Sequence, residues 1–583
     1  MQSISLAIAD RKTKMAQGEV PQFGYPVPGP QDIRPDDIMN DIFFLNDKEW
    51  DVERRKGNFD YVIIGSSFCA LAFVDQALKN NPNAKIMIIE RGTYYHPEHF
   101  QNLPPPFVMT MDGIGETFPW RITKKTHEGQ YIKWQHGVNN FFGGKSTFWS
   151  GWCPEPTDEE MEEWPKETKK VVHKYFPAVK QLLNVIPADQ ISKTEQGKDT
   201  IYGALQSDIQ ERLKDISSKI STITRWMPAP LAVEAHMYRN INFKKFSVPG
   251  PLLSKLYSLS VGQEKASIKD STMKIVINCV VKMIHHKEGK AVVLETSKGD
   301  FVLGNAKVIL AMGALPPTTL MLNSFSKHDF PSMINIGERF TAHFISSIFA
   351  RVPANTFCNY RKFGNMEMSA NYIAGRDLSS TSQFHIQLSA IYDNTPKKNL
   401  FDFIRHLPDV VAAPTMQQLL TSTDHVIFVC TVLGELDYDN DQNWFRKNED
   451  DDVTTNVTLQ VVANSKDNKV WETMEESSFQ MLDILAPSGL EYWHTHGGSS
   501  GDWAKGRPTV DMIRAPCIVH EASTMRLGKD TGSPVDLDYR FKGVDNVYLT
   551  GASLWPSGGS WNPTGAISAI AMHLADLICP KVN

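Results

Sequence analysis

Short runs of apolar residues, many of them β-branched, recur along the chain and end at glycine turns. The first run, residues 59–65 (Phe-Asp-Tyr-Val-Ile-Ile-Gly), predicts a fully buried parallel strand. A helix is expected over residues 67–79, and residues 85–90 (Lys-Ile-Met-Ile-Ile-Glu) predict a second strand. These three segments together predict a βαβ unit.

The regions before and after this unit have different patterns. Residues 1–57 contain several prolines and little periodicity, which predicts an extended arm over the surface. Residues 160–220 have a helical, charged pattern. Residues 271–312 alternate as β structure and lead into another buried run, residues 307–314, which enters a glycine turn.

Three later segments alternate between apolar and polar residues with a period near two: 383–389, 425–433 and 457–462. This period predicts a separate, largely antiparallel sheet. The acidic run 449–452 separates two of these segments, and we expect it to form a solvated turn.

Composition and charge narrow the class of protein. The chain has 583 residues, which favours two intertwined domains over one. Its formal net charge of -6 and the lack of a basic stripe argue against a nucleic-acid partner. The seven cysteines form no CxxC pair and are odd in number, so a reducing compartment is expected.

The N-terminus becomes charged at residues 10–12, too early for the apolar region of a signal peptide. No window reaches the roughly 20 apolar residues that would span a bilayer. We therefore expect an intracellular, cytoplasmic protein without a membrane span.

A dinucleotide fingerprint is indicated where the first strand meets its helix. Gly65 provides the tight turn, Ala70 is small enough for helix-to-strand packing, and Ser67 replaces the glycine that usually lets backbone approach the phosphates. The helix N-terminus offers free N–H groups to a pyrophosphate. Glu90 is placed to accept hydrogen bonds from a ribose. An ordinary strand–turn–helix with a capping serine is the alternative for this segment alone.

Three C-terminal motifs add to this signal: residues 520–528 (His-Glu-Ala-Ser-Thr-Met-Arg-Leu-Gly), 546–552 and 561–566. In this order, and together with residues 65–90, 143–150 and 308–314, they resemble the glucose-methanol-choline (GMC) family of flavoproteins, whose signature includes His-x-x-x-Thr-x-Arg-x-Gly and a late Asn-Pro. The resemblance implies FAD and a fold class of α/β plus α+β, in which a discontinuous Rossmann-like FAD-binding domain encloses an antiparallel-sheet substrate domain.

Within that family the middle of the chain is most similar to pyranose oxidases, over residues 143–149, 383–387 and 434–445. Phe148 stands where those enzymes can carry the histidine that is bonded covalently to flavin, so non-covalent FAD is expected. Met525 occupies a position where some of them have a histidine, so the catalytic histidine is assigned from the broader GMC pattern. By the same resemblance, residues 390–418 correspond to a mobile substrate loop and predict a lid.

Alcohol oxidation by hydride transfer requires a hydride acceptor, which is N5 of FAD, and a base for the hydroxyl proton. His520 is the candidate base, because a neutral imidazole titrates near the working pH; a structural core histidine is the alternative. Asn562 is expected to hydrogen-bond the substrate oxygen, or to cap a helix that starts at Pro563. That helix would direct its positive end toward the flavin pyrimidine.

The remaining candidates are backbone turns and small polar residues around the cofactor. Gly551 and Ala552 would admit the cofactor closely, and Ser150 would lie near flavin N5 or in a solvated loop. His494 and His496 lack a third ligand, so no metal is expected. The residues expected to bind FAD are Gly65, Ser66, Ser67, Glu90, Arg91, Gly143, Gly144, Ser146, Thr147, Ser150, Val281, Gly551, Ala552, Asn562, Pro563 and Thr564.

The predicted organisation has six segments, of which the first is the arm, residues 1–57. The FAD-binding domain comprises residues 58–160, 271–325 and 515–583, and the last of these contains the catalytic residues. The substrate domain comprises residues 161–270, which are mainly helical, and residues 326–514. The expected function is FAD-dependent oxidation of a sugar or glycoside hydroxyl to a carbonyl, with O2 or a quinone-like acceptor as the oxidant and oligomerisation left open. Alternatives are a GMC-type oxidase or dehydrogenase of a non-sugar alcohol, a non-redox FAD-containing lyase or light-driven decarboxylase, and a non-catalytic dinucleotide-binding scaffold.

Overall fold

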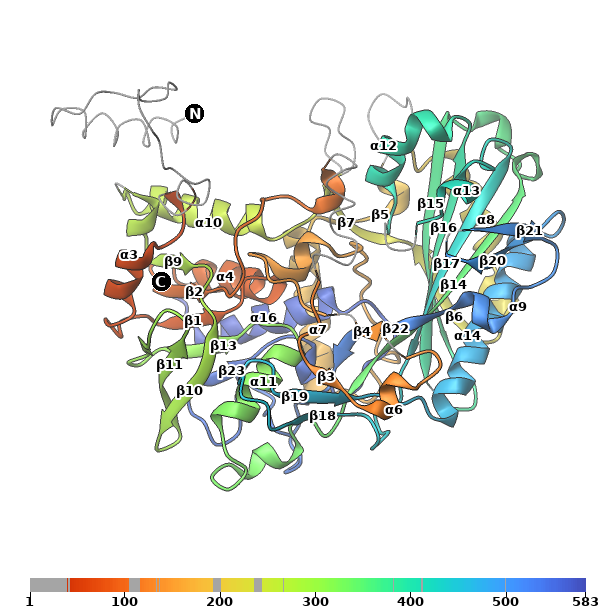
Figure 1. The fold of residues 1–583 in the computed structure, drawn as a ribbon. Coiled ribbons are helices and arrows are strands. Elements are labelled where there is room, and N and C mark those ends of the chain that lie inside the picture. Colours follow the sequence, from red (N-terminus) through yellow and green to blue (C-terminus); the bar gives the residue numbers. More distant parts are fainter. Residues whose placement is uncertain are drawn as a thin grey trace.

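A computed structural model gives the fold of the chain (Figure 1). It describes residues 39, 42–103, 116–132, 134–135, 137–191, 201–234, 244–265, 267–380, 382–409, 413–498 and 500–582. Most of the predicted arm lies outside these residues. The end of that arm is not extended: it forms helix α3 (Asp47–Glu53), because Asn46 and Glu49 make a capping box at its start.

Five parallel strands form the sheet on the left of Figure 1, in the order β23-β13-β1-β2-β9. Their bounds are β1 (Tyr61–Ile64), β2 (Ile86–Ile89), β9 (Met273–Val276), β13 (Lys307–Leu310) and β23 (Val547–Leu549). Ile64 pairs with Ile89 on one side and with Leu310 on the other, so the strands end together. The predicted βαβ unit and the predicted strand before the turn at Gly313 are confirmed.

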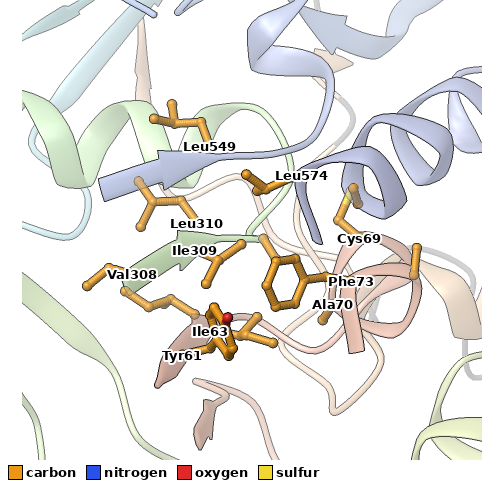
Figure 2. Close-up of a cluster of buried hydrophobic side chains, with 14 of the residues drawn as sticks. Tyr61, Ile63, Cys69, Ala70, Phe73, Val308, Ile309, Leu310, Leu549 and Leu574 are labelled. Atoms are coloured by element: carbon orange, nitrogen blue, oxygen red, sulfur yellow. The ribbon is translucent and has the colours of Figure 1, made fainter. Parts of the chain in front are cut away.

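Helices cover this sheet and close its core. They are α4 (Phe68–Asn80), α7 (Lys166–Leu182), α10 (Pro249–Gly262) and α16 (Thr564–Ile578). Figure 2 shows part of the apolar layer between strands and helices, with Ile63, Ile309, Leu549, Phe73 and Leu574 among its side chains. Burial of such residues is the main force that holds segments from both ends of the chain together.

Long antiparallel strands form a nine-stranded sheet on the right of Figure 1. Strands β6, β15, β16, β17 and β14 are neighbours in this order, and the opposite edge of β14 pairs with both β20 and β22. The bounds are β4 (Trp134–Gln135), β6 (Ile223–Pro228), β14 (Thr341–Pro353), β15 (Met366–Arg376), β16 (Gln383–Asp393), β17 (His425–Glu435), β20 (Glu491–Gly497), β21 (Ser500–Ala504) and β22 (Arg514–Ala522).

The two faces of this sheet differ in character. Even-numbered residues such as Phe344, Ile386 and Phe428 pack into an apolar cluster with α8 (Ala204–Leu213) and α14 (Ser465–Leu485). The ring of Phe344, for example, stacks on Trp471 with centroids 4.3 Å apart. Because side chains alternate along a strand, the odd-numbered residues face the other way, toward the C-terminal segment.

One predicted strand belongs to another sheet. The prediction that residues 383–389, 425–433 and 457–462 share a sheet holds for β16 and β17 but is wrong for the third segment. That segment forms β19 (Val457–Gln460), which pairs with β18 (Trp444–Lys447) and β3 (Arg121–Ile122). Alternation shows that one face is buried, but it does not identify the partner strand. The acidic run lies in the turn between β18 and β19, as predicted.

The remaining elements connect or flank these sheets. They are β5 (Val185–Pro187), β7 (Pro230–Glu234), β8 (Lys244–Lys245), β10 (Val281–Lys287), β11 (Lys290–Thr296), β12 (Phe301–Val302), α6 (Lys124–His127), α9 (Ile216–Lys219), α11 (Leu315–Ser324), α12 (Pro396–His406), α13 (Met416–Leu419) and α15 (Val510–Ile513). The predicted lid therefore contains the end of β16 and two helices, while its residues 410–412 lie outside the described part.

The mixed α/β class, with one parallel sheet and several antiparallel sheets, is confirmed. The six predicted segment boundaries remain predictions, although β22 lies in the nine-stranded sheet and not in the parallel sheet assigned to residues 515–583. All seven cysteines lie among the described residues and are free thiols. Among the helices that the structure describes, none combines the length and apolar character needed to cross a membrane.

Candidate active site

Glycine turns follow three adjacent strands at the carboxyl edge of the parallel sheet. Gly65, after β1, has φ +97°, and a Cβ there would lie 2.5 Å from the carbonyl oxygen of Ala311 after β13. Gly551, after β23, has φ +90°, and its Cβ would lie 2.9 Å from the carbonyl oxygen of Gly313. Side chains are therefore excluded, and backbone lines this edge, where open α/β sheets bind ligands.

Two helix N-termini meet at the same edge. Helix α4 begins at Phe68, three residues after Gly65, and Ser67 at its N-cap makes no capping bond through its side chain. Helix α16 runs beside α4 in the same direction: the Cys69 thiol donates to the carbonyl oxygen of Ile567, and Gln76 Nε2 donates to Asp576 Oδ1 at 2.7 Å. Two positive helix ends therefore lie close together, an arrangement that suits an anionic group.

Glu90 lies at the end of β2 and is buried. Ser66 Oγ donates to its Oε2 at 2.6 Å, and the Gly92 amide donates to its Oε1 at 2.7 Å. Burial raises the pKa of this carboxyl group, and the two hydrogen bonds offset part of that rise. Each carboxylate oxygen keeps a further lone pair, so Glu90 retains the capacity to accept hydrogen bonds from a ligand.

The predicted flavin segment is attached to this corner. The Gly143 amide donates to Ser66 Oγ at 2.8 Å, and Gly143, with φ +96°, starts the 3-10 helix η2 (Gly144–Thr147). A Cβ on Gly144 would lie 3.4 Å from Cβ of Ser67, so this turn and the start of α4 approach closely.

Two hydroxyl groups of that segment have partners inside the protein. Ser146 Oγ donates to the Gly143 carbonyl at 2.7 Å and accepts from the Val248 amide at 3.0 Å. Thr147 Oγ1 donates to the Gly144 carbonyl at 3.0 Å. These bonds shape the turn, so the structure gives both residues a role in holding it.

Other predicted cofactor residues lie along the same edge or next to it. The amide of Cys279 donates to the Glu90 carbonyl at 2.9 Å, which brings the start of β10, with buried Val281, beside Glu90. Arg91 follows Glu90 and is half-buried, and Ser150 is half-buried after η2. Ala552 begins the 3-10 helix η8 (Ala552–Leu554), and its carbonyl accepts from the Ser523 amide at 3.1 Å.

His520 lies in a β-bulge of β22. Val519 of β22 pairs with His343 of β14, and Ala522 pairs with Thr341. Over this interval β22 therefore has one residue more than β14. His520 itself has φ +64°, a left-handed conformation that is uncommon for residues other than glycine. Such a bulge re-aims a side chain. Here it turns His520 toward the face of the sheet that carries His343.

The two histidines contact each other directly. His520 Nδ1 and His343 Nδ1 are 2.9 Å apart, and their rings are nearly perpendicular. His343 is fully buried, and burial lowers its pKa to about 4. The nearby backbone of Gly558 and Gly559 attracts a ring proton and offsets part of this effect. His343 is therefore a neutral imidazole at pH 7.

Asn562 belongs to the same polar cluster. Gln387 Nε2 donates to Asn562 Oδ1 at 3.2 Å and lies 3.3 Å from His385 Nε2. His385 stacks on Tyr372 with ring centroids 5.0 Å apart and lies 6.2 Å from the ring of His343. Odd-numbered residues of β14 and β16 thus hold the side chains around both His520 and Asn562.

The predicted start of the last helix is displaced by one residue. Helix α16 begins at Thr564 with Pro563 as its N-cap, so the expectation that Asn562 caps a helix starting at Pro563 is wrong. The Asn562 side chain is turned instead toward the nine-stranded sheet, where it meets Gln387. The positive end of α16 still lies next to Asn562.

Glu435 closes the far side of the cluster. It is the strand partner of His343, and its Oε1 accepts from the Gly559 amide at 2.8 Å. Burial raises its pKa to about 7, although the Gly559 bond lowers it in part. The segment before Asn562 is therefore held by a carboxyl group that titrates near neutral pH.

The cluster and the cofactor edge are joined by short contacts. Lys145 of η2 places its Nζ 3.7 Å from Glu521 Oε2, next to His520. The Ser523–Ala552 hydrogen bond ties the end of β22 to the turn at Gly551. The structure thus brings His520 and Asn562 to the same edge as most of the predicted cofactor residues.

The sequence analysis missed four polar residues of this cluster: His343, His385, Gln387 and Glu435. A usable signal existed for two of them, because His385 and Gln387 lie among the mostly polar odd-numbered positions of a strand whose even-numbered positions are apolar. Polar groups that recur on one face of a buried strand need partners, which marks a polar site. His343 and Glu435 become neighbours only through strand pairing.

The pair His494 and His496 lies elsewhere. Strand β20 pairs with β14 at Ala350 and Arg351, roughly 23 Å along the strand from His343. His494 Nε2 contacts the Gly506 carbonyl at 2.7 Å, and His496 lies near Asp502 in an exposed hairpin. Neither is a candidate base, and within the described part of the chain it is His343 that contacts His520. Over the described ranges, no three His, Cys, Asp or Glu side chains gather as a metal site.

Comparison with known proteins relates this site to a family. Residues 441–571 match the C-terminal part of the family model described as GMC oxidoreductase. The crystal structure of pyridoxine 4-oxidase from Mesorbium loti aligns with a TM-score of 0.55 and 14% identity, over 89% of this chain and 99% of that chain. The search of curated proteins found no match.

The family match contains both His520 and Asn562, whereas the structural match concerns the fold of nearly the whole chain. The expected GMC resemblance is thus supported in the C-terminal part, and the fold is similar to that of the solved pyridoxine 4-oxidase. The narrower likeness to pyranose oxidases is not tested by either comparison. Residues 441–571, which include both candidate catalytic side chains, match the GMC oxidoreductase family model.

Proposed function

We propose that this protein is an FAD-dependent oxidoreductase that oxidises a CH–OH group to a carbonyl. The observation that supports this most is the polar cluster at the carboxyl edge of the parallel sheet, in which His520 contacts His343 and Gln387 holds Asn562. A structural histidine would not need a bulge with a left-handed backbone, a conformation that costs stability and is concentrated at functional sites.

The residues at the edge fit FAD. Two helix N-termini and the backbone turns at Gly65 and Gly551 provide N–H groups and room for a pyrophosphate. Glu90 has lone pairs for a ribose, and the η2 segment lies against the start of α4. When FAD is bound, it supplies the hydride acceptor.

The chemistry of the chain itself is proton removal. His520 takes the hydroxyl proton while the buried histidines His343 and His385 stay uncharged, and Asn562 orients the substrate oxygen through its amide. Gln387 holds Asn562 at 3.2 Å, so the amide is positioned before substrate arrives. Preorganised groups of this kind reduce the reorganisation needed in the transition state.

A sugar or other polyol is the preferred substrate class, because residues 143–149, 383–387 and 434–445 resemble pyranose oxidases. A non-sugar alcohol is the second candidate, since the solved structure named above is a pyridoxine 4-oxidase. The acceptor is O2 or a quinone-like molecule. In a third case, FAD would be present for lyase chemistry and would not be reduced.

Anaerobic titration of the purified flavoprotein separates these candidates. The protein is mixed in turn with sugars, glycosides, simple alcohols and pyridoxine. The absorbance of oxidised flavin, at about 450 nm, is followed during each titration. Bleaching by one class identifies the substrate whatever the acceptor. A lyase would turn over without bleaching, and a scaffold would show neither change.

FAD is proposed to be bound without a covalent link, because Phe148 has no nucleophilic atom to join it. Acid precipitation should release all of the yellow colour into the supernatant. As a control, the supernatant should contain intact FAD by mass spectrometry. Colour that stays in the protein pellet would contradict this prediction.

A further inference from the structure

The contact between His520 and His343 restricts where their protons lie. The two Nδ1 atoms are 2.9 Å apart, so one must donate and the other accept. A neutral imidazole carries a single N–H. If His343 donated, the proton of neutral His520 would lie on Nε2, and that atom would have no lone pair for a substrate proton.

The proposed role of His520 as the base requires the opposite arrangement. His343 Nε2 is buried and lies outside good hydrogen-bond geometry, but the backbone of Gly558 and Gly559 near the ring attracts a proton. If His520 is the base, its Nε2 must keep a lone pair for the substrate, so its own proton lies on Nδ1, the atom that contacts His343 Nδ1. His343 Nδ1 is then an acceptor, and His520 Nδ1–H is the donor.

Charged and titratable groups approach the pair from several elements. His343 is faced by His385 on β16, at 6.2 Å between rings, and by Glu435 on β17 as its strand partner. Arg225 on β6 acts on His385, whose pKa is lowered well below its ordinary value mainly by burial. None of these groups competes for His343 Nδ1, which is directed to β22.

Another group of charged residues lies beside the pair. Glu521 follows His520, and Lys145 Nζ lies 3.7 Å from both Glu521 Oε2 and Glu116 Oε1, so one ammonium group faces two carboxylates. These contacts are made by side chains of β22, of η2 and of residue 116, and they do not involve the two Nδ1 atoms. The hydrogen bond with His343 is the contact at His520 Nδ1 whose direction differs between the two tautomers.

We propose that His343 is a positioning residue that holds His520 in the tautomer with its proton on Nδ1, so that Nε2 accepts the hydroxyl proton of the substrate. The direction of this hydrogen bond rests on the proposed function, whereas the contact between the two rings does not. When Nε2 takes the proton, His520 becomes an imidazolium, its Nδ1–H still donates to His343, and no proton moves onward. The hydride that leaves the same carbon goes to the hydride acceptor.

Two variants distinguish the hydrogen-bond acceptor of the His343 side chain from the volume that this side chain occupies. In His343→Asn, the side-chain oxygen lies about where Nδ1 lies and still accepts; in His343→Leu, a similar volume carries no acceptor. An acceptor stabilises the imidazolium more than the neutral ring. The pKa of His520 should therefore fall by roughly half to one unit in His343→Leu and stay close to the parent value in His343→Asn.

The pKa is measured without substrate, from hydrogen exchange at C2 of each histidine, followed by mass spectrometry across pH. His494, which is remote from the site, serves as the internal control and should exchange identically in all three proteins. An unchanged pKa of His520 in His343→Leu, or an equal fall in both variants, would overturn the assignment.

Flavin reduction provides the second readout. His343→Leu should slow it ~10- to 100-fold, as for other residues that orient a histidine, while His343→Asn recovers most of the rate. If no substrate reduces the flavin, the proposed function fails, but the exchange result still decides the role of His343. If His343→Leu does not fold, nitrogen-15 NMR of labelled histidines in the parent decides between the tautomers: Nδ1–H on His520 supports the proposal, and Nε2–H overturns it.

Discussion

The carboxyl edge of the parallel sheet and the odd-numbered face of the nine-stranded sheet build two halves of one site by different means. The edge is made of backbone: glycine turns, helix N-termini and a single buried carboxyl group. The antiparallel face is made of side chains, His343, His385 and Gln387, that project from the middle or end of long strands. The glycine turns of the edge exclude side chains, whereas the antiparallel face depends on them.

This difference separates binding from proton transfer. The backbone turns have a fixed conformation, and most neighbouring side chains can change without altering it. Such turns suit a cofactor that is bound along its whole length. Side chains on alternating positions can be exchanged singly, which suits the part that meets a variable substrate. Changes at the edge should therefore affect cofactor content, and changes on the face should affect rate with the cofactor retained.

The largest effect is expected from Gly65→Ala. The new Cβ would meet the Ala311 carbonyl at 2.5 Å in a left-handed conformation, so the turn must shift. The variant should purify with little FAD and lose on the order of 1 to 3 kcal/mol of stability. Flavin absorbance per mole of protein and the thermal midpoint measure both effects.

Gly262→Ala is the matched control for that substitution. Gly262 ends α10, and a Cβ there meets no atom within 4 Å. This variant should keep its FAD and gain a few tenths of a kcal/mol up to about 1 kcal/mol, because alanine favours the helix. Equal FAD content in the two variants would show that the turn at Gly65 does not hold the cofactor.

A smaller effect is expected from Asn562→Ala on the side-chain half. The substitution removes the hydrogen bond with Gln387 and the amide that orients the substrate, but leaves His520 in place. One such bond corresponds to roughly a tenfold change in rate. FAD content should be unchanged while the rate of flavin reduction falls ~10-fold. Loss of FAD with an unchanged reduction rate would place Asn562 in the cofactor half instead.

The smallest effect concerns stability and pH at Glu435. Burial raises its pKa to about 7, so the folded protein holds this proton more tightly than the unfolded chain. Its contribution to stability is therefore full below the pKa of the unfolded carboxyl group, near 4.3, and is lost as pH rises through about 7. Glu435→Gln keeps an oxygen for the Gly559 amide and removes the titration.

The Gln variant should gain stability relative to the parent as pH rises from about 5 to 8, by an amount on the order of 3 kcal/mol at most. Thermal midpoints of both proteins at several pH values give this difference, and groups that titrate equally in both proteins cancel. A difference that is the same at pH 5 and pH 8 would show that Glu435 stays charged in the fold.

The contrast between the two halves also explains what the sequence could predict. Parallel strands such as 61–64 and 307–310 are continuous apolar runs that end at glycines, so local pattern predicts both the strand and its functional end. His520 and Asn562 were found because their short motifs resemble a family. His343 carries no local signal, since a histidine in a long apolar strand acquires its role only when β22 pairs beside it.

The features that the sequence analysis placed wrongly or missed also depend on contacts between distant parts of the chain. The alternation at residues 457–462 predicted a strand correctly, but its partners β18 and β3 come from distant parts of the chain. The bulge at His520 is equally non-local, because the extra residue is defined only against the register of β14. Asn562 was expected at a helix cap on local grounds, and its contact with Gln387 on β16 decided otherwise.

The central claim is that the edge of the parallel sheet binds the cofactor and that the antiparallel face transfers the proton. It is tested most directly by rapid anaerobic mixing of substrate with the parent protein and with His520→Ala at several pH values. The account predicts that the variant retains its FAD, reduces it ~10²- to 10⁴-fold more slowly, and loses the fall in rate that the parent shows as His520 becomes protonated at low pH. His494→Ala, in the remote hairpin, should match the parent. If His520→Ala reduces its flavin as fast as the parent, with the same pH profile, the histidine cluster of the nine-stranded sheet does not transfer the proton.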